Sequence, residues 1–131
     1  MFSENEAFSG FSVDDIAAAQ RFYGETLGLQ VTMNEMSNLD ITLGTGARIL
    51  LYPKPNHEPA TYTVLNFLVA DIDAAVSELV AAGITMEQYD FPEMKQDENG
   101  VMRADDRGPS IAWFKDPAGN VIAVIEANSS L

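Results

Sequence analysis

The order of apolar and polar residues in the first half of the chain predicts a strand, a helix and three further strands. Apolar and small polar residues alternate over residues 7–13, as in a strand that is covered on both faces. Asp14 and Asp15 favour the start of a helix, and Gly28 favours its end. The apolar residues between them recur at helical spacing: Ile16, Ala19, Tyr23 and Leu27. Three short apolar runs, separated by turn residues, follow at residues 29–33, 38–43 and 48–53.

The second half of the chain repeats this order. Val69-Ala70-Asp71-Ile72 aligns with Val13-Asp14-Asp15-Ile16 at an offset of 56 residues, which indicates an internal repeat. The expected elements are a strand at 62–69, a helix at 72–82 and strands at 84–89, 110–115 and 120–126. A polar loop at residues 91–109 precedes the last two strands. It is longer than most connections, which is typical of a lid or a disordered segment.

The domain organisation follows from length and from this repeat. A chain of 131 residues forms one domain, because chains usually divide only at about twice that length. We therefore predict a single α+β domain, residues 1–131, made of two tandem βαβββ modules. Module one covers about residues 6–53, a polar connector with two prolines covers 54–60, and module two covers about 61–127.

Composition and charge narrow the classes of function. The chain has no cysteine, which excludes disulfides, thiolate metal sites and cysteine nucleophiles. Its net charge of −13 repels nucleic acid and anionic membrane surfaces, so we expect neither as a partner. No leader pattern or membrane-spanning stretch of roughly 20 apolar residues is present, which predicts a cytoplasmic protein. The acidity serves either solubility or the attraction of a cationic small molecule.

The repeat and one hairpin motif together resemble a known superfamily. The motif is Ala112-Trp113-Phe114-Lys115-Asp116-Pro117-Ala118-Gly119-Asn120-Val121-Ile122. With the helix entry and exit of the first repeat, it resembles the vicinal oxygen chelate superfamily, which includes glyoxalases, bleomycin-resistance proteins and extradiol dioxygenases. The resemblance covers nearly the whole chain. It implies two βαβββ modules that form a curled mixed sheet, a concave cleft that holds the ligand, and commonly a homodimer.

The resemblance also implies where metal ligands would stand. Metal-using members carry His, Gln or Glu near the start of each module's first strand and in each module's last strand. The corresponding residues here are Phe8, Leu50, Val64 and Ala123. None of these side chains coordinates a divalent cation, so we expect no metal, no cofactor and no metal-based catalysis. The chain's one histidine, His57, lies in the connector, where we expect a solvated side chain.

Alternation along the strands predicts which side chains face the cleft, because residues two apart share a face. The expected ligand-binding residues are Phe8, Arg48, Tyr52, Tyr62, Asn66 and Trp113. Arg48 calls for an anionic or carbonyl partner, which is either a ligand or an internal Asp or Glu. The Asn66 side-chain amide is expected to form hydrogen bonds with a backbone group or with a ligand. Trp113 either lines the cleft or belongs to the core.

Other catalytic patterns are missing from the sequence. No phosphate-binding glycine loop, dinucleotide fingerprint or Ser-His-Asp set is present. Asp40 and Glu126 stand at strand positions and are the carboxylates left for acid or base chemistry.

Three functional hypotheses follow. The first is a metal-free protein of the bleomycin-resistance type that binds or sequesters a small organic molecule, with cations among the candidates, and is not an enzyme. The second is a glyoxalase- or dioxygenase-type metalloenzyme whose ligands stand elsewhere. The third is a structural dimer whose cleft is filled by its own side chains.

Overall fold

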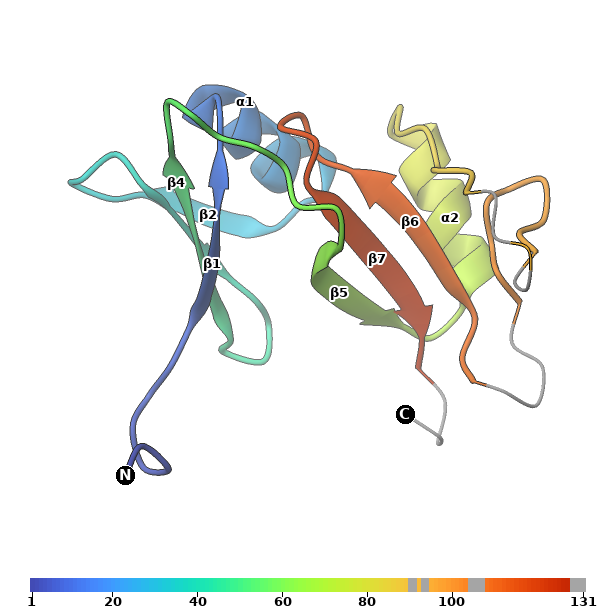
Figure 1. Cartoon of the computed structure of the whole chain (residues 1–131), viewed down its shortest axis with the longest axis horizontal. Coiled ribbons are helices and arrows are strands. Elements are labelled where there is room, and N and C mark those ends of the chain that lie inside the picture. The colour runs from blue at the N-terminus through green and yellow to red at the C-terminus, as the bar shows by residue number, and fades with distance from the viewer. Residues whose placement is uncertain (90–91, 93–94, 104–107, 128–131) are drawn as a thin grey trace. The chain divides into compact units, whose positions relative to one another are not determined.

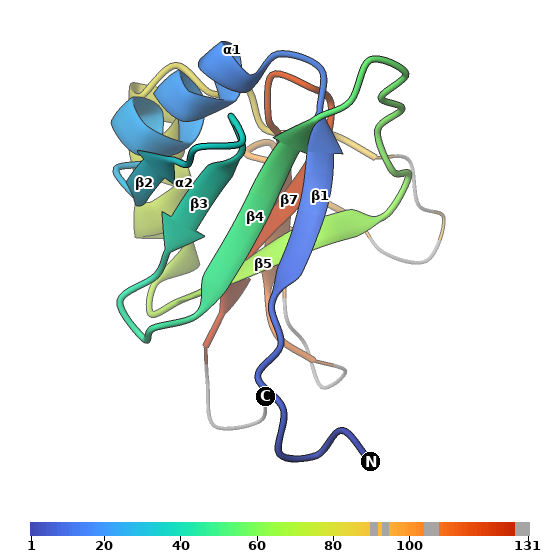
Figure 2. The same cartoon turned by 90° about the vertical axis from the view of Figure 1, so that its left-hand side faces the viewer.

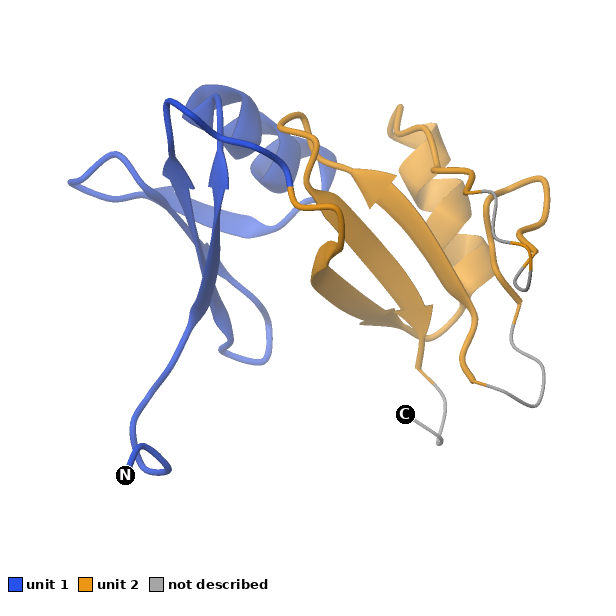
Figure 3. Ribbon diagram, in the orientation of Figure 1, with its two compact units in different colours: residues 1–59 blue, residues 60–131 orange. Residues whose placement is uncertain are grey.

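The computed structural model describes residues 1–89, 92, 95–103 and 108–127 and has the predicted α+β class (Figure 1). The chain divides into two compact units, residues 1–59 and residues 60–131 (Figure 3). Each unit combines one helical segment with one β-sheet. Within the described residues, no helix is long and apolar enough to cross a lipid bilayer.

Unit 1 contains a four-stranded sheet in the order β1-β4-β3-β2 (Figure 2). The strands are β1 (Ser9–Val13), β2 (Gln30–Met33), β3 (Leu39–Thr42) and β4 (Arg48–Pro53). Strand β1 runs parallel to β4, while β4, β3 and β2 form an antiparallel meander. The three apolar runs of the first half therefore form the predicted meander, and the first strand joins it after a helical crossover.

The helix of unit 1 begins where the sequence predicted. Asp15 is the N-cap of α1 (Ile16–Gln20), and its Oδ1 accepts a hydrogen bond from the Ala18 amide at 3.1 Å. The helix continues as a wider π-helical segment, η1 (Arg21–Thr26), whose end is marked by the bond from the Leu27 amide to the Phe22 carbonyl. Gly28 then takes a positive φ of 71° and ends the helix.

One face of the unit 1 sheet forms the core of that unit. Its buried side chains are Val13, Leu39, Ile41, Ile49 and Leu51, and Tyr23 from the helix is fully buried. The Tyr23 ring lies 6.3 Å from the Phe11 ring of β1, which joins the helix to the sheet. This is the helix-covered face that the alternation predicted for β1 and β4.

Unit 2 contains a three-stranded sheet in the order β5-β7-β6. The strands are β5 (Thr63–Val69), β6 (Ile111–Lys115) and β7 (Val121–Glu126), with β5 parallel to β7 and β6 antiparallel to it. The helix α2 (Ile72–Ala81) packs against β6 and β7, with Ile72 and Val76 buried. Strand β7 is apolar on both faces, as expected for the centre of a sheet.

The strand predicted at residues 84–89 is wrong. The Glu87 amide donates to the Trp113 carbonyl at 2.9 Å, but residues 84–89 form no strand. The Gln96 side chain forms hydrogen bonds with the backbone of this segment. It accepts a hydrogen bond from the Tyr89 amide and donates one to the Glu87 carbonyl. A side-chain amide thus replaces part of a strand ladder, which the apolar pattern alone does not reveal.

The predicted long loop at residues 91–109 lies partly outside the described residues. Its described segment, residues 95–103, turns back on itself through a bridge between Gln96 and Met102, and Met102 also pairs with Ile111 of β6. Gly100, at a φ of +85°, is buried in this turn, and an added Cβ there would lie 3.0 Å from the Glu87 carbonyl oxygen. The segment is therefore packed onto the body of unit 2.

Candidate ligand-binding site

The face of the unit 1 sheet opposite the core carries three of the predicted site residues. We call it the outer face, and it consists of Phe8, Gly10, Ser12, Asp40, Arg48, Leu50 and Tyr52. The register sets Gly10 beside Leu50 and Ser12 beside Tyr52, so β1 and β4 present these side chains in rows. Phe8 is 59% exposed and Tyr52 is 39% exposed, so two aromatic rings on this face meet solvent.

Arg48 is held in place by two neighbours on the outer face. Its guanidinium lies 5.5 Å from the centre of the Phe8 ring, and its Nη2 lies 3.3 Å from Asp40 Oδ1. The Asn34 side chain donates to the other Asp40 oxygen at 3.3 Å. Of the two partners left open for Arg48, the structure provides the internal carboxylate. The Arg48 side chain is still 57% exposed, so a ligand also has access to it.

His57 has a partner that the sequence did not indicate. The sequence predicts a solvated side chain, but His57 is half-buried and its Nδ1 lies 2.7 Å from the hydroxyl oxygen of Ser12. The connector folds back through a turn in which the His57 amide donates to the Lys54 carbonyl at 3.0 Å. The only signal for this in the sequence is the turn chemistry of Lys54-Pro55-Asn56.

Two further predicted site residues share a row in unit 2. Asn66 of β5 and Trp113 of β6 both pair with Ala123 of β7, so the three side chains emerge on one face. Asn66 is exposed, and Trp113 is half-buried with its ring 5.6 Å from the Tyr89 ring in an edge-on contact. Burial raises the pKa of Tyr89 above its ordinary value, and the nearby Glu87 carboxylate adds to the shift.

Tyr62 does not follow the parity predicted for it. Strand β5 begins at Thr63, and a register shift between Thr63 and Leu65 makes Thr63, rather than Val64, pair with β7 at Val121. A bulge of this kind breaks the rule that residues two apart share a face. Tyr62 lies before the bulge and is 70% exposed. The alternation from Asn66 therefore does not extend to it.

The two strand carboxylates have structural partners. Asp40 pairs with Arg48, and Glu126 Oε2 accepts a hydrogen bond from the Ile72 amide at 3.0 Å. Glu126 therefore sits at the start of α2, where the helix dipole favours a negative charge.

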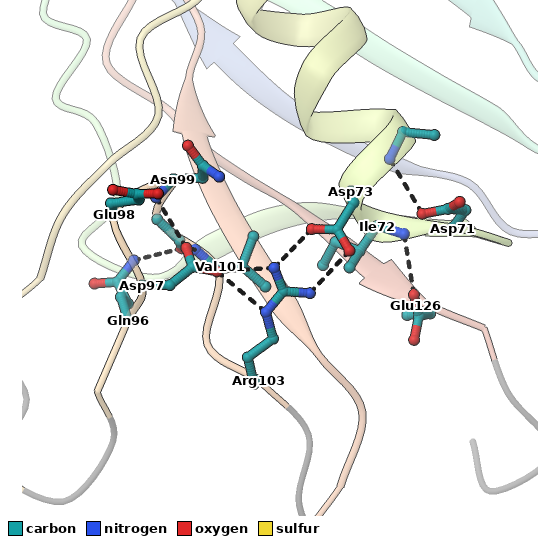
Figure 4. A network of polar contacts seen from close by, with 12 residues as sticks. Asp71, Ile72, Asp73, Gln96, Asp97, Glu98, Asn99, Val101, Arg103 and Glu126 are labelled. Atoms are coloured by element: carbon teal, nitrogen blue, oxygen red, sulfur yellow. Dashed lines mark hydrogen bonds and ion pairs between the residues drawn. The ribbon is translucent and has the colours of Figure 1, made fainter.

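A network of polar contacts joins the turn of residues 96–103 to α2 (Figure 4). Arg103 contacts Asp73 of α2 at 2.6 Å and Asp97 at 2.8 Å. The hydrogen bond from Arg103 lowers the pKa of Asp73. Partial burial acts to raise the pKa of Asp97, but bonds from the Val101 amide, Arg103 and the Asn99 amide outweigh it and lower that pKa. We call this arrangement the Arg103 bridge.

An open hollow lies beside the Arg103 bridge. It is lined by Asp73, Val76, Ser77, Val80, Ala81 and Asn99. Its walls come from α2 and from the turn, and none of the predicted site residues lines it.

The sequence matches a family model over most of its length. The model describes the glyoxalase, bleomycin resistance protein and dioxygenase superfamily and matches residues 8–124. The chain belongs to this superfamily. The resemblance seen in the repeat and in the hairpin motif is thereby confirmed, and so is the α+β fold class.

Solved structures of glyoxalase family proteins and of a fosfomycin resistance protein share the fold. A glyoxalase family protein from Enterococcus faecalis has 22% identity and a TM-score of 0.68, with 96% of this chain and 100% of that chain covered. A glyoxalase family protein from Bacillus anthracis has 22% identity and a TM-score of 0.70, with 98% and 100% covered. The fosfomycin resistance protein FosX from Listeria monocytogenes, in complex with Mn(II) and dihydroxypropylphosphonic acid, has 10% identity and a TM-score of 0.69, with 97% and 93% covered. No curated protein sequence matches the chain.

The four residues that the resemblance assigns to metal positions do not fit a divalent cation. Phe8, Leu50, Val64 and Ala123 carry only hydrocarbon side chains, and metal binding needs imidazole, carboxylate or carbonyl donors. Among the described residues, no group of three His, Asp or Glu side chains is arranged to hold a metal ion. The described residues of the outer face and of the row with Asn66 and Trp113 offer aromatic rings, the Arg48 guanidinium and hydrogen-bonding side chains.

Proposed function

We propose that this superfamily member binds and sequesters a small organic molecule without using a metal ion. The outer face of unit 1 is the observation that carries the proposal. It presents Phe8 and Tyr52 to solvent, and Arg48 is already oriented by Phe8 and Asp40. Apolar and aromatic surface with a few fixed polar groups is the usual composition of a small-molecule site.

The pre-set position of Arg48 favours binding. A flexible arginine loses side-chain entropy when it meets a ligand, whereas the contacts to Phe8 and Asp40 remove part of that cost beforehand. Asn66 and Trp113 form a second candidate surface in unit 2, with an exposed amide beside a half-buried indole. Each surface is testable by itself because the two sets of residues do not overlap.

The net charge of −13 supports a ligand that carries a positive charge away from Arg48, as a cationic drug of the bleomycin type could, because opposite charges attract. The same charge argues against nucleic acid and anionic membranes as partners. A homodimer is part of the proposal, since β1 and β2 are edge strands of the unit 1 sheet and strand edges favour pairing between chains. Light scattering on the purified chain measures that state directly.

The first experiment separates metal-free binding from metal-dependent catalysis. We would measure the melting temperature of the chelator-stripped protein with Mn, Fe, Co, Ni and Zn as divalent ions, because any species that binds only the native state raises it. The proposal expects no saturable rise with any ion. A saturable rise with one ion would contradict it and would favour the metalloenzyme hypothesis.

The second experiment identifies the ligand-binding face. A panel of cationic antibiotics and aromatic acids is screened by the same thermal assay, and affinities of the hits are measured by calorimetry. Arg48→Gln should weaken binding roughly tenfold or more, which is the usual value of a hydrogen bond to a charged group. Gln20→Ala, an exposed change on α1, is the control and should leave the affinity unchanged.

Fluorescence of Trp113, the chain's single tryptophan, reports on the unit 2 row. Quenching that Arg48→Gln leaves intact would assign the ligand to unit 2 instead. Full affinity in both Arg48→Gln and Asn66→Ala would overturn the site assignment.

A further inference from the structure

We propose that Ser12 and His57 form a second polar anchor on the outer face, so that the ligand is an elongated, flat aromatic molecule. One end carries an oxyanion or carbonyl that meets Arg48, and the other end carries a hydroxyl or amine that meets Ser12 and His57. This inference rests on the proposed function and names the class of ligand for the same face.

The two anchors lie at opposite ends of β1. Phe8, which contacts Arg48, is four residues before Ser12, and a strand advances about 3.3 Å per residue, so the anchors are separated by about 13 Å. Tyr52 stands beside Ser12 on β4, so each anchor also has an exposed aromatic ring next to it. A ligand that uses both anchors therefore needs about the length of two linked aromatic rings.

The strip of β1 and β4 between the anchors carries one aliphatic side chain and one residue without a side chain. Gly10 and Leu50 occupy it, and a Cβ at Gly10 would lie only 2.7 Å from the Leu50 carbonyl oxygen. Close packing of the two backbones thus leaves no room for a side chain at Gly10. Leu50 is half-buried and offers aliphatic surface. A planar ring system suits such a strip, because the missing side chain at Gly10 leaves the face of a ring free to contact the backbone and Leu50.

The chemistry of each anchor determines which functional group the ligand carries at the corresponding end. The Arg48 guanidinium has five N–H donors in one plane and no acceptor, so it favours oxyanions and carbonyl oxygens. The Ser12 hydroxyl and the His57 imidazole lie 2.7 Å apart and together present donor and acceptor atoms. A ligand hydroxyl or amine both donates and accepts, which matches this pair.

Local charge takes precedence over the net charge of the chain here. Salt screens charge interactions beyond about 8 Å at physiological ionic strength, so the Arg48 and Asp40 pair governs the Arg48 end of the face. A cation placed at Arg48 would be repelled. The charge of −13 therefore attracts cations to the molecule in general without selecting one at this position.

The test uses three aromatic acids that differ in length and in their far end. They are biphenyl-para-carboxylate, the same acid with a para hydroxyl on its far ring, and para-hydroxybenzoate, which is too short to reach both anchors. Calorimetry measures their affinities for the wild-type chain and for Arg48→Gln, Ser12→Ala and His57→Phe. Glu58→Gln, an exposed change in the same connector, is the control for the connector's fold.

We expect the far hydroxyl to strengthen binding by roughly fivefold in the wild-type chain, as for one net hydrogen bond. His57→Phe and Ser12→Ala should abolish that gain while biphenylcarboxylate itself still binds and still depends on Arg48. Glu58→Gln should retain the gain. Para-hydroxybenzoate should bind more weakly and should be indifferent to His57→Phe.

The outcomes also separate this inference from the proposed function. If biphenylcarboxylate binding depends on Arg48 but the far hydroxyl adds nothing, the second anchor is wrong and the binding function stands. If no biphenyl acid binds while another member of the wider panel does, the ligand class is wrong and the function again stands. If nothing in either panel binds, both proposals fail.

Discussion

The two units share one repeated sequence pattern but differ in the residues at the contact between their parallel strands. In unit 1, Gly10 of β1 faces Leu50 of β4. In unit 2, the repeat places Asn66 where unit 1 has Gly10, and Asn66 faces Ala123 of β7. The large and small members of the pair have changed strands. The same topology thus tolerates either arrangement, provided that one partner of the pair is small.

A second difference concerns the end of the last strand. In unit 2 this residue is Glu126, which accepts a hydrogen bond from the Ile72 amide at the start of α2. In unit 1 the equivalent strand ends at Pro53, which has no side-chain acceptor for α1. Among the described contacts of the two helix starts, Asp15 caps α1, whereas Asp71 and Glu126 both accept amide hydrogen bonds at the start of α2. The difference shows that a repeat preserves the fold while its supporting contacts diverge.

The largest expected loss in the free energy of unfolding comes from placing a carboxylate in the central row of the unit 2 sheet, compared with the same change in unit 1. Ala123→Glu buries a carboxylate at a position that is only 1% exposed, and we expect a loss of about 3–5 kcal/mol in the free energy of unfolding. Leu50→Glu, at the half-buried counterpart, should cost about 1–2 kcal/mol because the carboxylate keeps contact with solvent. Urea unfolding measures both losses. Equal losses would contradict the difference in burial between Ala123 and Leu50.

The next effect tests the close approach of β1 and β4. Gly10→Ala places a methyl group 2.7 Å from the Leu50 carbonyl oxygen, so the strands must move apart, at a cost of about 1–3 kcal/mol. Gly44→Ala is the matched control, because nothing lies within 4 Å of an added Cβ there. It should change the free energy of unfolding by less than about 1 kcal/mol. A neutral Gly10→Ala would mean that β1 has room for a side chain.

A smaller effect distinguishes the two helix starts. Asp15→Ala should cost about 1 kcal/mol, since it removes the acceptor for the Ala18 amide. Asp71→Ala removes the equivalent bond to the Ala74 amide but leaves Glu126 on the Ile72 amide, so its cost should be lower. The double variant Asp71→Ala with Glu126→Gln should then lose more than either change alone, as measured by urea unfolding. The idea fails if Asp71→Ala is the costlier of the two cap variants.

The smallest effect concerns the Arg103 bridge, which has no counterpart among the described contacts of unit 1. Asp73 and Asp97 have lowered pKa values in the folded chain, so their contribution to stability is present above the unfolded pKa of about 3.9. It is lost as the pH falls through the lower, folded pKa. Amide exchange at Val101, whose N–H donates to Asp97, should therefore quicken below about pH 4 relative to other buried amides.

Arg103→Gln should speed the Val101 exchange at neutral pH and reduce its dependence on acid. The effect on global stability should be slight, because exposed ion pairs contribute little. Exchange at Ile41 in unit 1 is the internal reference and should be unaffected by the substitution. Unchanged exchange at Val101 would show that the turn is held by its other bonds.

The strand order and the buried face were predictable because they depend on patterns that the sequence shows directly. Alternation assigned Ile49 and Leu51 to the core and Arg48 and Tyr52 to the outer face, and Asp15 and Gly28 marked the limits of the first helix. The superfamily was predictable because the hairpin motif and the repeat are specific together.

The remaining differences arise from contacts between distant residues. The Gln96 side chain satisfies the backbone around Glu87, which makes an apolar run into a non-strand segment. The bulge before Leu65 changes the parity that was assigned to Tyr62. The contact between His57 and Ser12 depends on how a turn folds the connector across 45 residues of sequence. No local pattern encodes such contacts, because each depends on where another segment of the chain comes to lie.

The bond between Glu126 and the Ile72 amide also has a consequence for the order of folding. Its partners are 54 residues apart, so a long segment of chain must close before the bond forms. During synthesis, α2 is made well before the final strand. The first turn of α2 therefore receives this bond only when β7 has taken its central place between β5 and β6, so completion of the helix start and closure of the unit 2 sheet should occur as one late step.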